Sequence, residues 1–283
     1  MEVLVVGNTA YVDDDFCAKA FPGDHVKVVA AAEARRDESS PHASWKELLQ
    51  HLDQAYEFDR VVYLSNYLTP LTDSVGDIEL LRSVFRTCAG RRVRLLYVAG
   101  PAGAEGAADA AGRTGKGIIA HAANDLCRYY AAREGVQTKI LRVPFLYTAS
   151  AALEDPFLVP LFDACSTGSA ALQGAQDAAF PLLCAEELSV LVRRIFDSWN
   201  GNFETLDVAD AFHHTVGEVG DALKALFPGL SVAYGDSVGY ALPASDVARV
   251  RYGWFQRYDL LRDLSTIQAR WDAGRAKKVN PLR

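Results

Sequence analysis

Long hydrophobic runs are absent from this sequence, and so is an export signal. No uninterrupted apolar stretch approaches the roughly 18 residues that indicate a transmembrane helix. Residues 1–7 lead directly into a strand-like pattern, without the basic and apolar segments that a secretory signal needs. We therefore expect a cytoplasmic protein with no membrane partner.

Closely spaced cysteines are also missing. The five cysteines are scattered along the chain: Cys17, Cys88, Cys127, Cys165 and Cys184. An odd number of separated cysteines is typical of reduced, buried thiols. His213 and His214 are adjacent, and adjacent side chains do not share a face of a helix or a strand. We predict no metal site.

An excess of basic residues is lacking as well. The formal net charge is -7 and the isoelectric point is near 5.4. Nucleic acids favour a basic stripe, so we expect no nucleic-acid partner. The one basic cluster, residues 275–278, is typical of a solvated tail. The Gly-x-Ser-x-Gly motif of serine hydrolases is absent too.

The sequence does contain a regular alternation of strand-like and helix-like segments. Strands are predicted at residues 3–6, 26–30, 60–64, 94–98 and 138–143. Helices are predicted between them, at about residues 13–20, 44–52, 76–88 and 117–134. Such an alternation predicts a doubly wound parallel sheet.

The alternation loses its regularity after Pro144. Helices are predicted at residues 185–199, 216–227 and 259–276, and strands at 203–208 and 230–234. We predict an α/β protein with two parts. Residues 1–150 form a Rossmann-type, NAD(P)-binding-like domain with a doubly wound parallel sheet. Residues 151–283 form a smaller C-terminal α/β lobe, interleaved with the first part and resembling a substrate-binding lobe.

Five segments, in their order along the chain, carry a family resemblance. They are residues 3–12, 121–131, 139–147, 180–188 and 252–260. Together they resemble the extended short-chain dehydrogenase/reductase family, the NAD-dependent epimerase/dehydratase group. The resemblance covers nearly the whole chain. It implies a Rossmann fold, NAD or NADP as cofactor, a small-molecule substrate and a homodimer.

The glycine loop of the resembled family is altered here. The family loop is Gly-x-x-Gly-x-x-Gly, which lets a pyrophosphate approach a helix N-terminus. The three positions are Gly7, Ala10 and Asp13 in this chain. Carboxylates in a first helical turn stabilise the helix by roughly 0.3–1 kcal/mol each, but they place negative charge where a phosphate would bind. Two interpretations stay open: a capped helix without a ligand, and a dinucleotide that tolerates the aspartates.

A retained cofactor would contact a short set of residues. The resemblance assigns Gly7, Asn8, Ala10, Tyr11, Val12, Glu33 and Arg35 to it. Glu33 could bind the ribose hydroxyls of NAD, whereas Arg35 could bind the 2′-phosphate of NADP. Both residues come later than the family register implies, so a solvated loop is the competing interpretation. NAD, NADP and a lost cofactor all stay open.

The catalytic positions of the family are also replaced. The resemblance implies a Tyr, a Lys four residues later and a Ser or Thr at the preceding strand end, since a cation near a phenol lowers its pKa. Lys116 falls at the Tyr position, Ala120 at the Lys position and Gly100 at the Ser position. The standard mechanism is therefore predicted to be absent.

Three residues could supply other acid/base chemistry: Lys116, His121 and Tyr147. His121 titrates near neutrality but also suits a surface or capping position, and Tyr147 also suits packing. One hypothesis is a divergent, non-catalytic epimerase/dehydratase-like protein that serves as a binding or scaffold protein, with a small molecule in the former cleft. The alternative is an active NAD(P)-dependent oxidoreductase, epimerase or dehydratase with a non-standard acid/base, acting on a nucleotide sugar or a similar small molecule. Enzymatic activity is thus left open.

The predicted helix at residues 117–134 bears on the oligomeric state. Ile118, Ala122, Leu126 and the pair Tyr129 and Tyr130 follow one side of it. The resembled family commonly dimerises through this helix, so a homodimer is expected. The same stripe also suits burial in the core.

Overall fold

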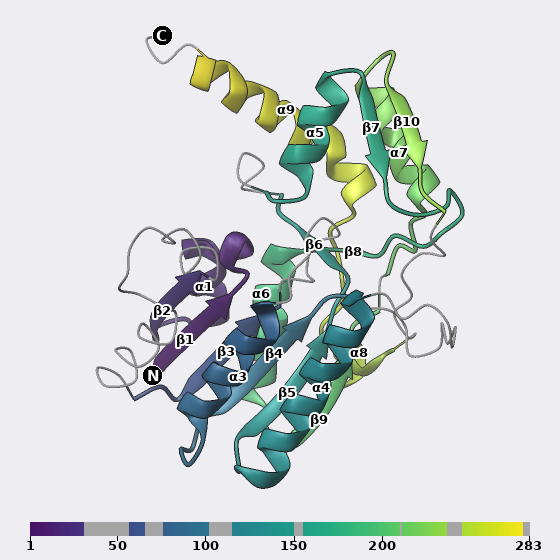
Figure 1. Cartoon of the computed structure of the whole chain (residues 1–283). Coiled ribbons are helices and arrows are strands. Elements are labelled where there is room, and N and C mark those ends of the chain that lie inside the picture. The colour runs from purple at the N-terminus through teal and green to yellow at the C-terminus, as the bar shows by residue number, and fades with distance from the viewer. Residues whose placement is uncertain are drawn as a thin grey trace, which may run out of the picture.

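A six-stranded parallel sheet lies at the centre of the protein (Figure 1). The computed structural model describes residues 1–30, 57–65, 76–101, 115–149, 155–209, 211–236 and 245–279. The strand order is β2-β1-β3-β4-β5-β9, and every neighbouring pair is parallel. The bounds are β1 Glu2–Gly7, β2 His25–Ala30, β3 Arg60–Leu64, β4 Arg94–Ala99, β5 Gln137–Arg142 and β9 Phe203–Asp207. The predicted Rossmann-type sheet is confirmed.

Helices cover both faces of this sheet. The helices α1 Asp14–Ala20, α6 Ala185–Asp197 and α8 Val247–Tyr252 pack on one face, and α3 Gly76–Cys88 and α4 Gly115–Arg133 on the other. Successive side chains of a strand point to opposite faces. Val3 and Val5 accordingly join the core beneath α1 and α6, whereas Leu4 and Val6 join the core beneath α3 and α4. Both faces of the strands are therefore apolar, as expected of a sheet covered on both sides.

A smaller lobe lies beyond the carboxyl ends of the sheet strands (Figure 1). It contains two short parallel pairs, β6 Phe145–Tyr147 with β8 Leu182–Cys184, and β7 Ser169–Leu172 with β10 Ser231–Tyr234. Its helices are α5 Leu158–Ser166, α7 Val216–Leu226 and α9 Leu260–Val279. They enclose a separate apolar core. Since α6, β9 and α8 belong to the layers of the large sheet, the two parts are interleaved along the chain.

Most of the predicted elements lie close to their expected positions, and a few do not. The predicted helix at residues 44–52 lies outside the described residues. The short elements β6, β7, α5 and α8 were not predicted. Among the described residues, no helix combines the length and the apolarity needed to cross a membrane. The described part of the chain also holds no cluster of three or more His, Cys, Asp or Glu side chains suited to a metal ion.

A buried ion network joins β5 to β9 at the sheet edge. Lys139 on β5 is 1% exposed, and its ammonium pairs with the carboxylate of Glu204 on β9. Arg251 of α8 pairs with the same carboxylate. The Lys139 ammonium also lies 5.2 Å from the centre of the Trp199 ring. Burial raises the pKa of Glu204, but the two cations outweigh it and hold that pKa below its ordinary value.

Candidate functional site

The switch point of the sheet lies between β1 and β3. In a doubly wound sheet, ligands bind at the carboxyl ends of the strands where the strand order reverses. Here β1 has β2 on one side and β3 on the other, so the reversal occurs at Gly7 and Leu64. The candidate cleft is therefore at these two strand ends.

Position 7 requires a glycine, because the ends of β1 and β3 lie very close together there. Its φ of +108° lies in the region that favours glycine, and a Cβ there would be 2.2 Å from the carbonyl oxygen of Leu64. The next residue, Asn8, donates its backbone N–H to that same carbonyl at 2.7 Å. The fold alone thus accounts for the first glycine of the loop, without any bound ligand.

Some of the residues after Gly7 are exposed to solvent, and others are buried in the core. A 3₁₀ turn covers Thr9–Tyr11, in which Ala10 is exposed. Tyr11 is buried in the core shared with α1 and α6, and Val12 packs against that core. The structure describes five of the residues predicted to contact a cofactor. Gly7, Asn8 and Ala10 lie at the carboxyl end of β1 or just after it. Tyr11 and Val12 face inward. Glu33 and Arg35 lie outside the described residues.

Asp13 caps the first helix. It has extended backbone angles, and its carboxylate accepts the backbone N–H of Phe16 at 2.7 Å. Asp14 and Asp15 follow in the exposed first turn of α1. An N-cap carboxylate takes up one of the free N–H groups that a phosphate would otherwise use. The described residues at this end of the cleft therefore do not fit a pyrophosphate on the helix N-terminus.

Helix α4 carries the altered catalytic positions. Lys116 belongs to its first turn, and the side chain of Lys116 is outside the described part of the structure. Ala120 and His121 follow, each partly buried. The tyrosines of α4 lie two turns further on, where Tyr130 stacks on Phe85 with ring centres 4.7 Å apart. The Tyr–Lys pair of the resembled family therefore has no counterpart at its motif positions.

Tyr147 lies inside the core of the smaller lobe. Its side chain is completely buried, and its phenol oxygen has no hydrogen-bond partner among the described residues. Burial raises the pKa of Tyr147 well above its ordinary value, and the nearby Cys184 and Asp263 raise it further. A phenol held neutral in an apolar core cannot serve as a base near neutral pH. The position of Tyr147 suits a packing role.

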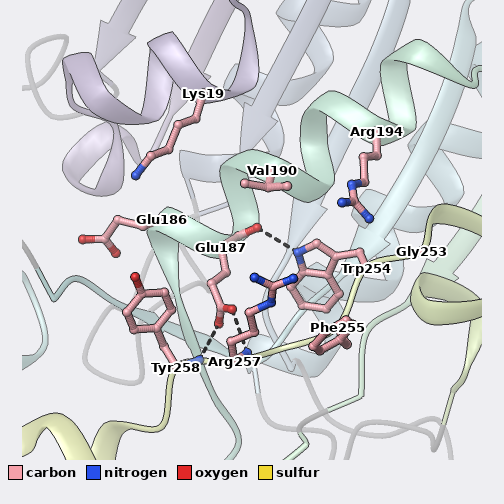
Figure 2. Close-up of a pocket in the computed structure, with 10 residues that line it drawn as sticks. All are labelled: Lys19, Glu186, Glu187, Val190, Arg194, Gly253, Trp254, Phe255, Arg257 and Tyr258. Carbon is pink, nitrogen blue, oxygen red and sulfur yellow. Dashed lines mark hydrogen bonds between the residues drawn. The ribbon is translucent and has the colours of Figure 1, made fainter.

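A hollow beside Lys19, in the last turn of α1, was not predicted from the sequence (Figure 2). It lies between α1, α6 and residues 253–258, and its volume is about 290 Å³. Its walls come from three separate parts of the chain: Lys19, Glu186, Glu187, Val190, Arg194, Gly253, Trp254, Phe255, Arg257 and Tyr258. The sequence signal for it is the cluster of aromatic and basic residues at 254–258.

The fold, with its switch point, defines a Rossmann-type α/β protein. No family model matches the sequence, and no curated protein does. Solved structures do match. A dTDP-glucose 4,6-dehydratase from Bacillus anthracis, in complex with NAD, aligns with a TM-score of 0.72 and 13% identity over 98% of each chain.

Two further structures agree. A dTDP-glucose 4,6-dehydratase from Streptomyces venezuelae, with NAD bound, aligns with a TM-score of 0.70 and 13% identity over 100% of both chains. A GalE-like L-threonine dehydrogenase from Cupriavidus necator aligns with a TM-score of 0.63 and 18% identity, covering 95% of this chain and 98% of its own. At these identities the likeness establishes the fold. This chain has the fold of the epimerase/dehydratase-type short-chain dehydrogenases, as the resemblance predicted.

Proposed function

We propose that this protein is a non-catalytic binding or scaffold protein, built on the fold of NAD-dependent epimerases and dehydratases. It lacks the Tyr, Lys and Ser chemistry, and its former cleft holds a small molecule other than a dinucleotide. The observation that carries the proposal is the Asp13 carboxylate, which caps α1 at the position of the third loop glycine. The replacement of the catalytic Lys by Ala120 supports it independently.

Charge repulsion at the exposed Asp13 carboxylate would oppose a pyrophosphate. Two like unit charges 4 Å apart repel by about 1 kcal/mol in bulk water and by about 4 kcal/mol at an effective dielectric constant of 20. Asp14 and Asp15 add two more carboxylates in the same turn. Moving the Asp13 side chain away would relieve part of this repulsion, but it would also remove the cap, which contributes about 0.5–2 kcal/mol. Binding a dinucleotide therefore costs free energy whether the Asp13 side chain stays at the cap or moves away from it.

Direct titration tests the proposal. The purified full-length protein is first checked for co-purified dinucleotide, and is then titrated with NAD, NADH, NADP and NADPH by calorimetry. We expect no saturable binding at millimolar ligand. Binding at micromolar concentration, or turnover of a nucleotide sugar with NAD(P), would refute the proposal.

A variant separates charge from helix stability. Asp13→Asn keeps a good N-cap side chain while removing the charge, so the fold should be retained. If repulsion by Asp13 excludes the dinucleotide, this variant should bind NAD(H) measurably more strongly than the wild type. Asp221→Asn is the matched control, because Asp221 is an exposed carboxylate of α7 in the smaller lobe, away from this turn, and pairs with Lys224.

Dinucleotide binding would instead favour catalysis by other acid/base groups. Stoichiometric co-purified NAD(P) would support an active oxidoreductase, epimerase or dehydratase with a non-standard acid/base. Lys116→Ala or His121→Ala would then abolish its activity.

The homodimer through α4 belongs to the same proposal. Tyr129 is 53% exposed on this helix, and Ala122 is exposed two turns earlier. Residues seven apart share a helix face, so these two offer a weakly polar surface to a second copy. Sedimentation of the wild type and of Tyr129→Glu tests it: a dimer that the variant weakens is expected, and a wild-type monomer would contradict it.

A further inference from the structure

The hollow between α1, α6 and residues 253–258 has a preformed wall. Both carboxylate oxygens of Glu187 accept backbone N–H groups of the 253–258 segment, from Arg257 at 2.7 Å and from Tyr258 at 3.1 Å (Figure 2). The indole Nε1 of Trp254 donates to the carbonyl oxygen of Glu187 at 3.0 Å. Three hydrogen bonds to one residue of α6 thus fix the segment. A ligand would not have to order this wall on binding.

Aromatic rings form much of this wall. Phe255 is 53% exposed and Tyr258 is 44% exposed, and both line the hollow beside the buried Trp254 (Figure 2). Exposed aromatic residues occur singly on most proteins and then need no explanation. Here three aromatic residues within five positions border one concave site, which is typical of a small-molecule pocket.

The polar groups of the wall are mostly engaged with the protein itself. Glu187 binds the backbone as described, and Glu186 accepts the thiol of Cys184 at 2.7 Å. Lys19 pairs with Asp15. Arg194 donates to the carbonyl oxygen of Tyr252 at 2.7 Å. These interactions hold the four side chains against the protein, while Lys19 and Arg194 keep further N–H groups.

Arg257 is the exception. Its guanidinium carbon lies 4.8 Å from the centre of the Phe255 ring. Within the described ranges of the chain, no carboxylate lies within ion-pair distance of it. A guanidinium stacked on a ring keeps its N–H groups in one plane, where they can bind a carboxylate or a phosphate in a bidentate manner.

We propose that this hollow binds a small planar aromatic molecule with one anionic group, with Arg257 holding the anion and Phe255 and Tyr258 flanking the ring. The hollow meets α1 at Lys19, in the last turn of that helix, whereas the former dinucleotide cleft is at the opposite end, beside Asp13. The site is therefore separate from the cleft and does not depend on the function proposed for it.

Titration of the full-length protein with 2-naphthoate tests the site. Calorimetry should show saturable binding to the wild type at millimolar concentration or below. The neutral analogue 2-naphthamide and the non-aromatic cyclohexanecarboxylate should each bind at least about tenfold more weakly, since each lacks one of the two recognition elements. NAD at millimolar concentration should not displace 2-naphthoate.

Two arginine variants make the test specific. Arg257→Ala should weaken 2-naphthoate binding by roughly tenfold or more, because charge-assisted hydrogen bonds are lost. Arg193→Ala is the matched control: Arg193 is an exposed arginine of α6 that pairs with Asp197 and does not line the hollow. Circular dichroism checks that both variants fold. No saturable binding to the wild type, equal affinity of the two variants, equal binding of the amide, or displacement by NAD would each overturn the proposal.

Discussion

The ion network at the β5–β9 edge predicts an asymmetric response to mutation. Removing one partner of a buried ion pair costs about 3–5 kcal/mol, because the remaining charge is left without compensation. Glu204→Gln would leave the ammonium of Lys139, which is 1% exposed, without a compensating charge, facing only a neutral amide oxygen and the Trp199 ring. We expect a loss of about 3 kcal/mol of unfolding free energy, at the low end of that range because the cation–π contact persists.

Replacing Lys139 while keeping Glu204 should cost much less unfolding free energy. In Lys139→Met the carboxylate of Glu204 keeps its pair with Arg251, and its side chain is 26% exposed. Methionine also fills the volume of the lysine stem. We expect a loss below about 1.5 kcal/mol, and the double variant should resemble Lys139→Met, with a coupling energy of about 3 kcal/mol.

Urea unfolding followed by far-ultraviolet circular dichroism measures these differences at neutral pH, and an acid series adds a check. The pKa of Glu204 is held below its ordinary value of 4.5, so its contribution is complete above that pH and is lost as the pH falls through the folded-state pKa. The stability difference between the wild type and Glu204→Gln should therefore shrink below about pH 4.5. A larger cost for Lys139→Met than for Glu204→Gln, or a difference that grows on acidification, would refute this reasoning.

Three further changes have distinct expected outcomes. Gly7→Ala should lower the unfolding free energy by about 2–5 kcal/mol, since the new Cβ would contact the Leu64 carbonyl and the φ of Gly7 is positive; an unchanged melting temperature would contradict the strand-approach argument. Asp155→Ala should cost about 3 kcal/mol, because this buried carboxylate accepts three backbone N–H groups, at 2.6, 2.8 and 2.6 Å; a loss below about 1 kcal/mol in urea would contradict it. Cys184 should resist a thiol-specific reagent at neutral pH until the protein unfolds, because burial raises its pKa; mass spectrometry of labelled native protein would detect any early modification.

The strands of the large sheet were predictable from the sequence because both faces of each are buried. Residues 3–6, 60–64 and 94–98 are apolar or β-branched runs, and the structure places strands there to within one or two residues. The pairs β6·β8 and β7·β10 were harder, because strands of three or four residues show no measurable periodicity. Residues 230–234 were predicted as a strand, but their partner β7 was not.

Some features of the candidate sites could likewise be predicted from the sequence, and others could not. The cap at Asp13 could be predicted, since it depends on residues two to three positions away. The burial of Tyr11 could not, because it depends on α6, which lies far along the chain. The hollow beside Arg257 depends on hydrogen bonds to Glu187, 70 residues earlier. Contacts over such separations leave no local signal in one sequence.

The position of β9 limits how this protein can be divided or synthesised. This strand follows β6, α5, β7 and β8 of the smaller lobe in sequence, yet it pairs with β5 at the edge of the large sheet. A fragment that ends at residue 150 would lack β9, leaving β5 without its neighbour, and would lack α6, which supplies Leu188, Leu191 and Val192 to the core. An exposed edge strand beside an uncovered apolar face is a template for aggregation. During translation the nascent chain therefore stays vulnerable until residues 203–207 have left the ribosome, and any shortened form that is to fold stably must extend past them.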